Sequence, residues 1–288
     1  MNFFKRKYLQ SYLKFLRFFK NNDVLFCKTK YYYKNSYQLN LDNPTEFTDK
    51  IQWLKLNHYK QDYGDFVCKF TVRKYVSQTI GDNYLNQVYG VFDAIHEIDY
   101  NKLPNKFVLK CTHGSGYNVI VSDKSKLCFQ RTKAKLSKFF KRNYYKENRE
   151  AIYKDLKPKI IIEKYLSEVG NNSLTDYKFY CFHGVPKYVL VKINDKKCFY
   201  DLNWNKITPD KLTNDYLSEE VEQPSSLNEM IEVATKLAAN FIFIRVDLYS
   251  IENKVIFGEL TFFPTGGNKR INVERFNQEF GNYITLPI

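Results

Sequence analysis

The sequence contains little glycine, few histidines and no paired cysteines. Only 11 of its 288 residues are glycine, against an average share of about 7%, so each glycine cluster carries information. The four histidines and six scattered cysteines form no CxxC pair, which excludes a zinc knuckle and a disulfide framework. We therefore expect free thiols in a reducing cytoplasm.

Long hydrophobic runs are also missing. No apolar stretch approaches the roughly 20 residues of a membrane span, and charges interrupt the N-terminus too often for the core of a signal peptide. Residues 1–20 instead space apolar side chains three or four positions apart among lysines and arginines, which predicts a basic amphipathic helix. We expect a cytoplasmic protein whose first helix packs on its own domain or rests on the anionic inner face of a membrane.

Positive charge is in excess. Lysine and arginine number 45 and the acidic residues 31, which gives a net charge of +14 and favours anionic partners such as nucleotides, acidic sugars or a membrane face. Charge alone does not choose among them. Aromatic residues make up 17% of the chain, but they follow core periodicities, and no nucleic-acid motif is present. We do not expect a nucleic-acid partner.

The pattern of elements divides the chain into three parts. Residues 1–105 indicate a helical N-terminal region, residues 106–168 a small lobe with a glycine loop, and residues 169–288 a C-terminal lobe of strands and helix. No repeat or linker separates them. The expected class is α+β, with mixed or antiparallel sheets.

Two helices begin at typical capping sequences. Asn43 stands at an N-cap position, Pro44 at the first helical position and Glu46 at the third. Later in the chain, Ser226 and Glu229 have the spacing of a capping box before an apolar helical stretch. The sequence therefore predicts helix starts at both places.

Two carboxylates occur inside the otherwise apolar strands of a predicted hairpin, residues 242–261. Side-chain alternation across a tight turn can bring Asp247, Glu259 and Thr261 to one face. Two carboxylates and a neutral oxygen are hard ligands suited to a magnesium ion that holds polyphosphate. The alternative is an ion pair of Asp247 with Arg245 on a solvated strand, but an unpaired charge inside an apolar strand is costly, which favours the metal site.

A lysine and a glycine loop follow the strand that begins near residue 107. Lys110 leads into Gly114-Ser115-Gly116, whose glycines would let backbone amides approach phosphate oxygens beside a fixed positive charge. A hairpin turn needs glycine in any case, so this signal is weak alone. Lys178, between apolar neighbours on another strand, is either a second phosphate contact or a lysine extending from an edge strand.

The segment Glu163-Lys164-Tyr165-Leu166 follows a strand of three isoleucines. If it links two lobes, its backbone can offer hydrogen bonds to an adenine while an apolar side chain covers the ring. Taken alone, it is a strand end.

The order of these pieces is more specific than any one of them. A strand lysine with a glycine loop is followed by I-I-I-E-K-Y-L, D-Y-K-F, R-V-D-L-Y and G-E-L-T-F-F-P-T-G-G. This order resembles the ATP-grasp superfamily, which includes the D-alanine:D-alanine ligases, and more closely the TupA-like ATP-grasp family associated with cell-surface polysaccharide biosynthesis. The resemblance covers residues 43–267 and implies an ATP-grasp fold, in which two α+β lobes grip ATP.

The resemblance also implies the binding residues. Magnesium would be held by Asp247, Glu259 and Thr261, the last of which replaces an asparagine common in the superfamily and leaves the number of metal ions open. Gly266-Gly267 would bring backbone amides to the acceptor. The residues that would bind ATP are Lys110, Gly114, Ser115, Gly116, Glu163, Lys164, Tyr165, Leu166 and, for the ribose, Glu168.

Three further residues would act on the reacting groups. By resemblance, Arg245 would neutralise an acyl phosphate and Lys178 would contact a phosphate. His113, in the glycine loop, is a candidate base for an amine, although a loop histidine is more often a phosphate or solvent contact. No Ser/His/Asp or Cys/His arrangement suggests a covalent nucleophile.

The function implied is that of an ATP-dependent carboxylate-amine ligase, which forms an amide on a uronic acid of a capsular or other surface polysaccharide through an acyl phosphate. ATP and magnesium would be the cofactors, and the partners an acidic sugar, nucleotide sugar or glycan together with a small amine. The alternative is a sugar kinase or glycosyltransferase at the membrane. No DxD motif and no dinucleotide-binding glycine fingerprint supports that alternative.

Overall fold

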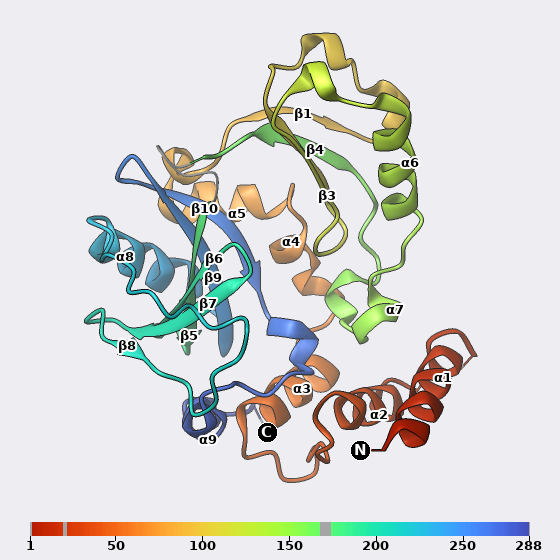
Figure 1. Cartoon of the computed structure of the whole chain (residues 1–288), viewed down its shortest axis with the longest axis vertical. Coiled ribbons are helices and arrows are strands. Elements are labelled where there is room, and N and C mark those ends of the chain that lie inside the picture. Colours follow the sequence, from red (N-terminus) through yellow and green to blue (C-terminus); the bar gives the residue numbers. More distant parts are fainter. Residues whose placement is uncertain (1, 20–21, 168–173, 288) are drawn as a thin grey trace.

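Two antiparallel sheets form the framework of the protein, with helices around them (Figure 1). The computed structural model describes residues 2–19, 22–167 and 174–287. Its mixture of helices and separate antiparallel sheets confirms the expected α+β class. The smaller sheet has the order β1-β4-β2-β3 and contains β1 (Val88–Phe92), β2 (Phe107–Cys111), β3 (Asn118–Val121) and β4 (Ile160–Lys164). The larger sheet has the order β10-β9-β5-β6-β7-β8 and contains β5 (Thr175–Phe182), β6 (Val185–Ile193), β7 (Lys196–Asp201), β8 (Lys206–Ile207), β9 (Phe243–Ile251) and β10 (Lys254–Thr261).

The helices pack in four places. Helix α6 covers the small sheet, α8 packs on the large sheet together with α5, and α3 packs against α9. The first two helices pack against each other near the N-terminus (Figure 1). The α-helices are α1 (Phe3–Phe19), α2 (Asp23–Asn35), α3 (Phe47–Asn57), α4 (Gly64–Val67), α5 (Val72–Ile80), α6 (Phe129–Phe140), α7 (Tyr145–Asn148), α8 (Leu227–Ala238) and α9 (Glu274–Asn282). Within the described ranges, no helix combines the length and apolarity needed to cross a membrane.

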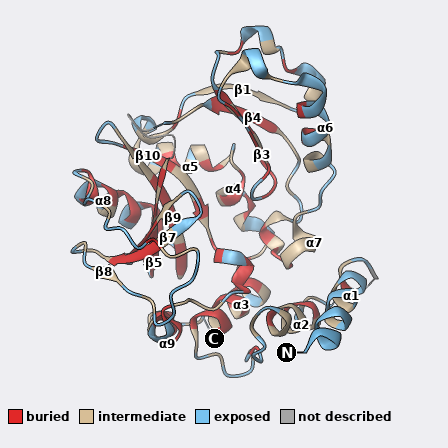
Figure 2. Cartoon of the chain, viewed as in Figure 1, coloured by how far each residue is buried: buried red, intermediate tan, exposed pale blue. Residues whose placement is uncertain are grey.

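Separate hydrophobic cores lie beneath the two sheets (Figure 2). In the small sheet, alternation turns Phe107 and Leu109 of β2 into the core and leaves Lys110 on the opposite face. The larger core joins the six-stranded sheet to α3 and α9 through contacts between aromatic rings. The ring of Phe47 lies 5.1 Å from that of Phe243 and 5.5 Å from that of Phe280, both edge to face. The same alternation therefore packs each sheet and exposes polar side chains on its other face.

Helix α3 does not begin where the sequence predicts. It begins at Phe47, and the predicted cap at Asn43 is wrong. Glu46 has extended backbone angles and forms an ion pair with Arg270, while the backbone around Thr45 lies directly against Gly281 of α9. These contacts with the C-terminal helix hold the segment outside the helix, so tertiary packing overrides the local capping signal.

Helix α8 occurs as predicted, but without its predicted cap. The Ser226 hydroxyl bonds to the hydroxyl of Ser250 at 2.8 Å instead of to the helix backbone. The Glu229 carboxylate accepts a hydrogen bond from Tyr84 at 2.9 Å. The capping box is therefore wrong, because both side chains have partners on neighbouring elements.

The central strand β4 is attached to the rest of the protein at both ends. At its end, Lys164 donates its backbone N–H to the Gln87 carbonyl, and the Asn86 side chain donates to the Lys164 carbonyl, both at 2.9 Å. Before its start, Ile152 is buried in the larger core. Strand β1 pairs with β4, although it precedes residue 106. The three-part division of the chain stays a prediction.

Candidate active site

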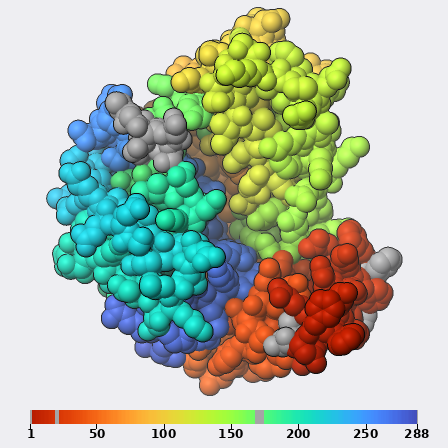
Figure 3. Space-filling model, in the orientation of Figure 1, coloured from red at the N-terminus to blue at the C-terminus, as the bar shows by residue number. Residues whose placement is uncertain are grey.

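A cavity of about 230 Å³ lies between the two sheets. Figure 3 shows the surface hollowed between the yellow-green small-sheet part and the cyan and blue part. The small sheet, its glycine loop, the large sheet and the region of α4 and α5 all contribute to the lining. Among the lining residues are Lys69, Arg73, Lys110, Ser115, Gly116, Glu163, Asp176, Lys178, Asp247, Tyr249 and Glu259.

A β-bulge brings the two predicted metal ligands together. Strands β9 and β10 pair in one register up to Phe257, and the register then shifts so that Glu259 lies directly opposite Asp247. Without the shift, Glu259 would oppose Val246 of the core. The bulge falls at Gly258, where a Cβ would lie 2.9 Å from the Asp247 carbonyl oxygen. Glycine at this position is therefore required for the paired carboxylates.

Asp247 is held by two cations. Arg245 donates from Nε and Nη2 to its carboxylate at 2.6 and 2.7 Å, and Lys178 donates at 2.5 Å. Asp247 is 2% exposed, and the side chains of both cations are 12% exposed. The ion pair with Arg245 thus exists, but on a buried strand and not on a solvated one. Lys178 lies on β5, an interior strand, so the edge-strand alternative is wrong.

The charges of this cluster are mutually dependent. Burial would raise the pKa of Asp247, but the positive charges of Arg245 and Lys178 outweigh it and leave the pKa lowered. For Lys178, burial would lower the pKa, and the neighbouring Asp247 carboxylate raises it overall. The three groups therefore remain charged together.

Glu259 is the more open of the two carboxylates. Its side chain is 41% exposed, and Arg245 Nη2 lies 3.3 Å from it. The Thr261 hydroxyl donates to Glu259 at 3.2 Å and accepts from Arg245 at 3.1 Å. Thr261 itself does not line the cavity. Its hydroxyl therefore orients the Glu259 carboxylate from outside the cavity.

The carboxylates of Asp247 and Glu259 fit a magnesium ion that is also coordinated by phosphates. The described part of the chain contains no cluster of three or more acidic, histidine or cysteine side chains that could hold a metal alone. Magnesium is commonly bound by one or two carboxylates together with substrate phosphates and water. Asp247 and Glu259 provide two such carboxylates at the cavity wall. The residues present therefore fit this mode and not an all-protein cage.

Cationic side chains and the glycine loop form the opposite wall. Lys110 donates to Glu163 at 2.6 Å across β2 and β4, so the predicted phosphate contact and the predicted adenine contact are paired with each other. Ser115 and Gly116 line the cavity, whereas Gly114 does not. Gly116 has φ +73°, a left-handed conformation that suits glycine.

Several predicted residues lie away from the cavity. His113 is 4% exposed, packs against α6, and its Nε2 lies 3.2 Å from the Phe139 carbonyl; burial lowers its pKa. Lys164, Tyr165 and Leu166 do not line the cavity. Arg245 lines a second cavity. Glu168, the candidate ribose ligand, lies outside the described residues.

Lys69 and Asp176 also line the cavity, although neither is among the residues predicted from the sequence. Lys69, just after α4, donates to the Gly114 carbonyl at 2.6 Å, and burial lowers its pKa. No local pattern distinguishes it from other lysines. Asp176 lies two residues before Lys178 on β5, and their charged groups are 3.5 Å apart. Because alternate residues of a strand share a face, the spacing of Asp176 and Lys178 could have predicted that both face the cavity.

Among the solved structures that the chain matches are several ligases. D-alanine–D-alanine ligase from Bacillus anthracis, complexed with ATP, is 14% identical, with a TM-score of 0.40 over 75% of this chain and 56% of that one. The Helicobacter pylori D-alanine–D-alanine ligase is also 14% identical, with a TM-score of 0.42 over 83% and 61%. The ATP-grasp ligase PsnB with precursor peptide PsnA2 and AMPPNP is 9% identical, with a TM-score of 0.44 over 81% and 63%. The chain thus spans less than two thirds of each of these proteins.

A comparison with curated proteins gives no match. The TupA-like ATP-grasp family model matches residues 49–285, most of the chain. This match confirms the resemblance, the ATP-grasp fold and, at the level of the family, an ATP-grasp enzyme. The chain belongs to the TupA-like ATP-grasp family.

Proposed function

We propose that the protein is an ATP-dependent carboxylate-amine ligase. The observation that carries the proposal is the pair of opposed carboxylates, Asp247 and Glu259, facing a cavity whose other wall holds cations and a glycine loop. Phosphoryl transfer depends mainly on positioning and charge neutralisation, and this cavity offers both.

The chain's own residues would bind the polyphosphate and its metal. Asp247 and Glu259 would hold magnesium, which when bound neutralises phosphate charge. Lys110, Lys69 and Lys178 would add positive charge around the phosphates, because all three line the cavity. The Ser115–Gly116 loop would cover them and exclude water.

The reaction would have two steps. A carboxylate oxygen of the substrate attacks the γ-phosphorus of ATP, and ADP leaves, which gives an acyl phosphate. An amine nitrogen then attacks the acyl carbon, inorganic phosphate leaves, and the amine loses a proton as the amide forms. Arg245 and Lys178 lie where they can offset negative charge beside Asp247. The mechanism makes no use of His113, whose imidazole packs against α6.

The proposed substrate is a uronic acid of a capsular or other surface glycan, free, nucleotide-linked or polymeric, and the proposed amine is a small amino compound. The net charge of +14 supports an acidic substrate. The protein would act in the cytoplasm, where ATP is available.

Helix α1 supports a peripheral contact with the inner membrane face. Phe4, Tyr8 and Phe18 are exposed along one side of the helix, and Phe4 is 82% exposed. Leu16 is buried on the other side. With lysines along the helix, this surface has the chemistry of an interfacial anchor. Cosedimentation with phosphatidylglycerol vesicles but not with phosphatidylcholine vesicles is the expected result, and no difference between them would contradict it.

Calorimetric titration with Mg·ATP tests the nucleotide site first. Wild type should bind, Glu259→Gln should lose binding, and the matched control Glu232→Gln, exposed on α8, should bind as wild type does. Absence of binding to wild type would refute the proposal.

Turnover then tests the reaction. ADP release that needs both D-glucuronate and an amine such as glycine supports a ligase. Transfer of phosphate to a sugar hydroxyl would instead support the sugar kinase alternative and overturn the ligase.

A further inference from the structure

The excess of positive charge is concentrated in two segments of the chain. Residues 1–22 contain six lysines and arginines, residues 124–146 contain nine, and neither segment contains an acidic residue. The whole chain has 45 such cations and 31 acidic residues, so the other 243 residues carry 30 cations and 31 acidic side chains and are close to neutral. Charge distributed so unevenly indicates a surface that binds an anionic partner.

The fold brings the two segments side by side. The second segment runs through α6 into α7, and α7 packs against α1. At this contact, the Lys146 ammonium lies 5.8 Å from the centre of the Phe18 ring, although the two residues are more than 100 positions apart. Figure 2 shows α6 and α1 exposed along the same edge of the molecule. Residues 2–19 and 124–146 therefore form one surface, which we call the basic edge.

Helix α6 turns one side to the small sheet and cations to the solvent. Thr132 and Leu136 are buried where the helix packs on β2 and β3. Arg131, Lys135 and Lys138 are spaced four and three residues apart, so they share a side of the helix, and all three are exposed. None of them forms an ion pair with a residue that the structure describes. Their charges are therefore available to a partner.

The two helices of the basic edge expose different chemistry. Helix α1 exposes aromatic rings among its cations, with Phe4 82% and Phe18 64% exposed. In α6, Leu136 lies in the core of the small sheet, and Phe139 and Phe140 pack against the same core. The exposed side of α6 is therefore mainly cationic. Aromatic rings can enter the boundary between lipid headgroups and acyl chains, while lysines and arginines attract the anionic headgroups.

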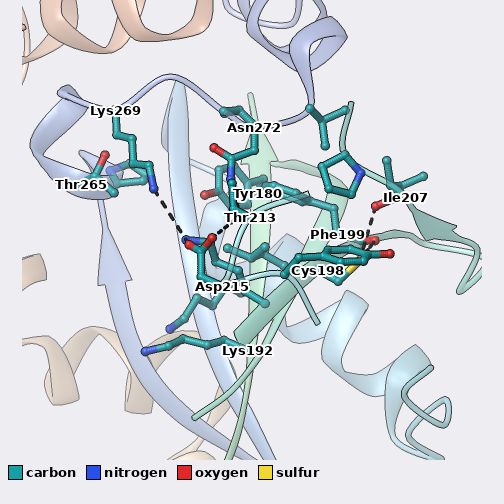
Figure 4. Close-up of a pocket in the computed structure, with 18 of the residues that line it drawn as sticks. Tyr180, Lys192, Cys198, Phe199, Ile207, Thr213, Asp215, Thr265, Lys269 and Asn272 are labelled. Atoms are coloured by element: carbon teal, nitrogen blue, oxygen red, sulfur yellow. Dashed lines mark hydrogen bonds and ion pairs between the residues drawn. The ribbon is translucent and has the colours of Figure 1, made fainter. Parts of the chain in front are cut away.

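The basic edge lies outside the cavities. Neither the cavity between the sheets nor the second cavity, of about 370 Å³ beside the large sheet (Figure 4), takes a lining residue from it. Lys110 faces the first cavity from the side of the small sheet opposite α6. An exposed surface of cations and rings outside these cavities suits the face of a bilayer and not a small ligand. We expect a protein bound through this edge to keep its affinity for Mg·ATP.

We propose that α6 is a second membrane-binding element, which binds the headgroups of anionic phospholipids beside the rings of α1. The proposal deepens the membrane contact proposed for α1 and rests on it. A single weak anchor binds a membrane reversibly, and a polybasic surface next to it supplies the second signal that stable binding requires. Each lysine or arginine near an anionic bilayer strengthens binding about fivefold. The outer side of the small sheet then faces the membrane.

Cosedimentation of the full chain with vesicles of phosphatidylglycerol and phosphatidylcholine tests α6. A triple variant removes three charges of the helix: Arg131→Gln, Lys135→Gln and Lys138→Gln. It should bind roughly 100-fold more weakly than wild type. The matched control removes the same charge from exposed positions elsewhere: Lys211→Gln, Lys236→Gln and Lys254→Gln. It should bind as wild type does, because charges act over only about 8 Å at physiological salt. Both variants should bind Mg·ATP with wild-type affinity.

Cys128 provides an independent measurement of contact. It directly precedes α6 and is exposed, whereas the other five cysteines are buried. A nitrobenzoxadiazole dye attached to Cys128 should be quenched by phosphatidylglycerol vesicles that carry lipid with a spin label on its headgroup. The same dye at Lys236→Cys, on α8 in a Cys128→Ser background, should not be quenched.

The proposal is overturned if the triple variant of α6 binds vesicles as wild type does, or if the dye at Cys128 is not quenched. In either case, the contact through α1 stands alone. Failure of wild type to bind the vesicles refutes both contacts. If the triple variant loses binding to soluble polygalacturonate and not to vesicles, α6 is a glycan-binding surface, which also overturns the proposal. Mg·ATP binding is measured separately and tests the ligase function independently of the membrane.

Discussion

Removal of the Asp247 charge should destabilise the protein strongly, independently of any ligand. Asp247 is 2% exposed and accepts three hydrogen bonds, two from Arg245 and one from Lys178. In Asp247→Asn, these cations remain buried without their carboxylate. Breaking a buried ion pair from one side typically costs about 3–5 kcal/mol. At roughly 2–4 °C per kcal/mol for a protein of this size, the thermal midpoint should fall by about 6–20 °C.

A double-mutant cycle identifies the cause of this loss. If uncompensated positive charge is responsible, removing one cation should relieve it, so Asp247→Asn with Lys178→Met should be more stable than the sum of the single effects predicts. The expected coupling is about 1–3 kcal/mol, the range for residues in one charge network. Urea unfolding followed by circular dichroism at pH 7 measures all four proteins.

Glu259→Gln is the matched control, because its side chain is 41% exposed and Arg245 lies 3.3 Å away. It should cost at most about 1 kcal/mol, as exposed ion pairs do, while still abolishing Mg·ATP binding. The reasoning would be refuted if Asp247→Asn cost less than about 1 kcal/mol or if the cycle were additive within about 0.5 kcal/mol.

Three further outcomes are expected. Lys69→Met, which removes the hydrogen bond to the Gly114 carbonyl, should weaken Mg·ATP binding roughly 10- to 100-fold by calorimetry, and unchanged affinity would contradict it. Burial raises the pKa of Glu150 from 4.5 to about 7, so the folded state retains a proton that the unfolded chain loses, and stability should fall as pH rises from 4.5 to 7. In Glu150→Gln, the decrease in the free energy of unfolding between pH 5 and pH 8, measured with urea, should be smaller than in wild type by up to about 3 kcal/mol. An equal pH dependence in both proteins would refute the raised pKa of Glu150. Gly281→Ala should lower stability by about 1–3 kcal/mol, because its Cβ would meet the Thr45 backbone, and a thermal midpoint within 2 °C of wild type, roughly 1 kcal/mol or less, would contradict this.

The elements that carry the site were predictable from local patterns. The hairpin with Asp247 and Glu259 and the hairpin around the glycine loop both occur at the expected residues. Alternation nevertheless gave the right face for Glu259 only because a bulge at Gly258 shifts the register. A single glycine inside a strand suggests a bulge, but not which way it turns the following side chain.

What could not be predicted depends on contacts distant in sequence. The start of α3 is set by Arg270 and Gly281, more than 200 residues away. Lys69 enters the site because the region between α4 and α5 packs beside the glycine loop. His113 lies close to glycine-loop residues in sequence, yet α6 covers its ring. Sequence proximity does not determine which face a loop side chain takes.

The two attachments of β4 have a mechanical consequence. The strand is held before Ile160 by the buried turn at Ile152 and after Glu163 by the hydrogen bond between Lys164 and Asn86. We therefore expect the small sheet to rotate about β4 as an axis. Residues on β4, such as Glu163, would keep their position during this rotation. Ser115, at the tip of the hairpin between β2 and β3, would move furthest. The hydrogen bond from Lys69 to the Gly114 carbonyl would hold the glycine loop over the cavity.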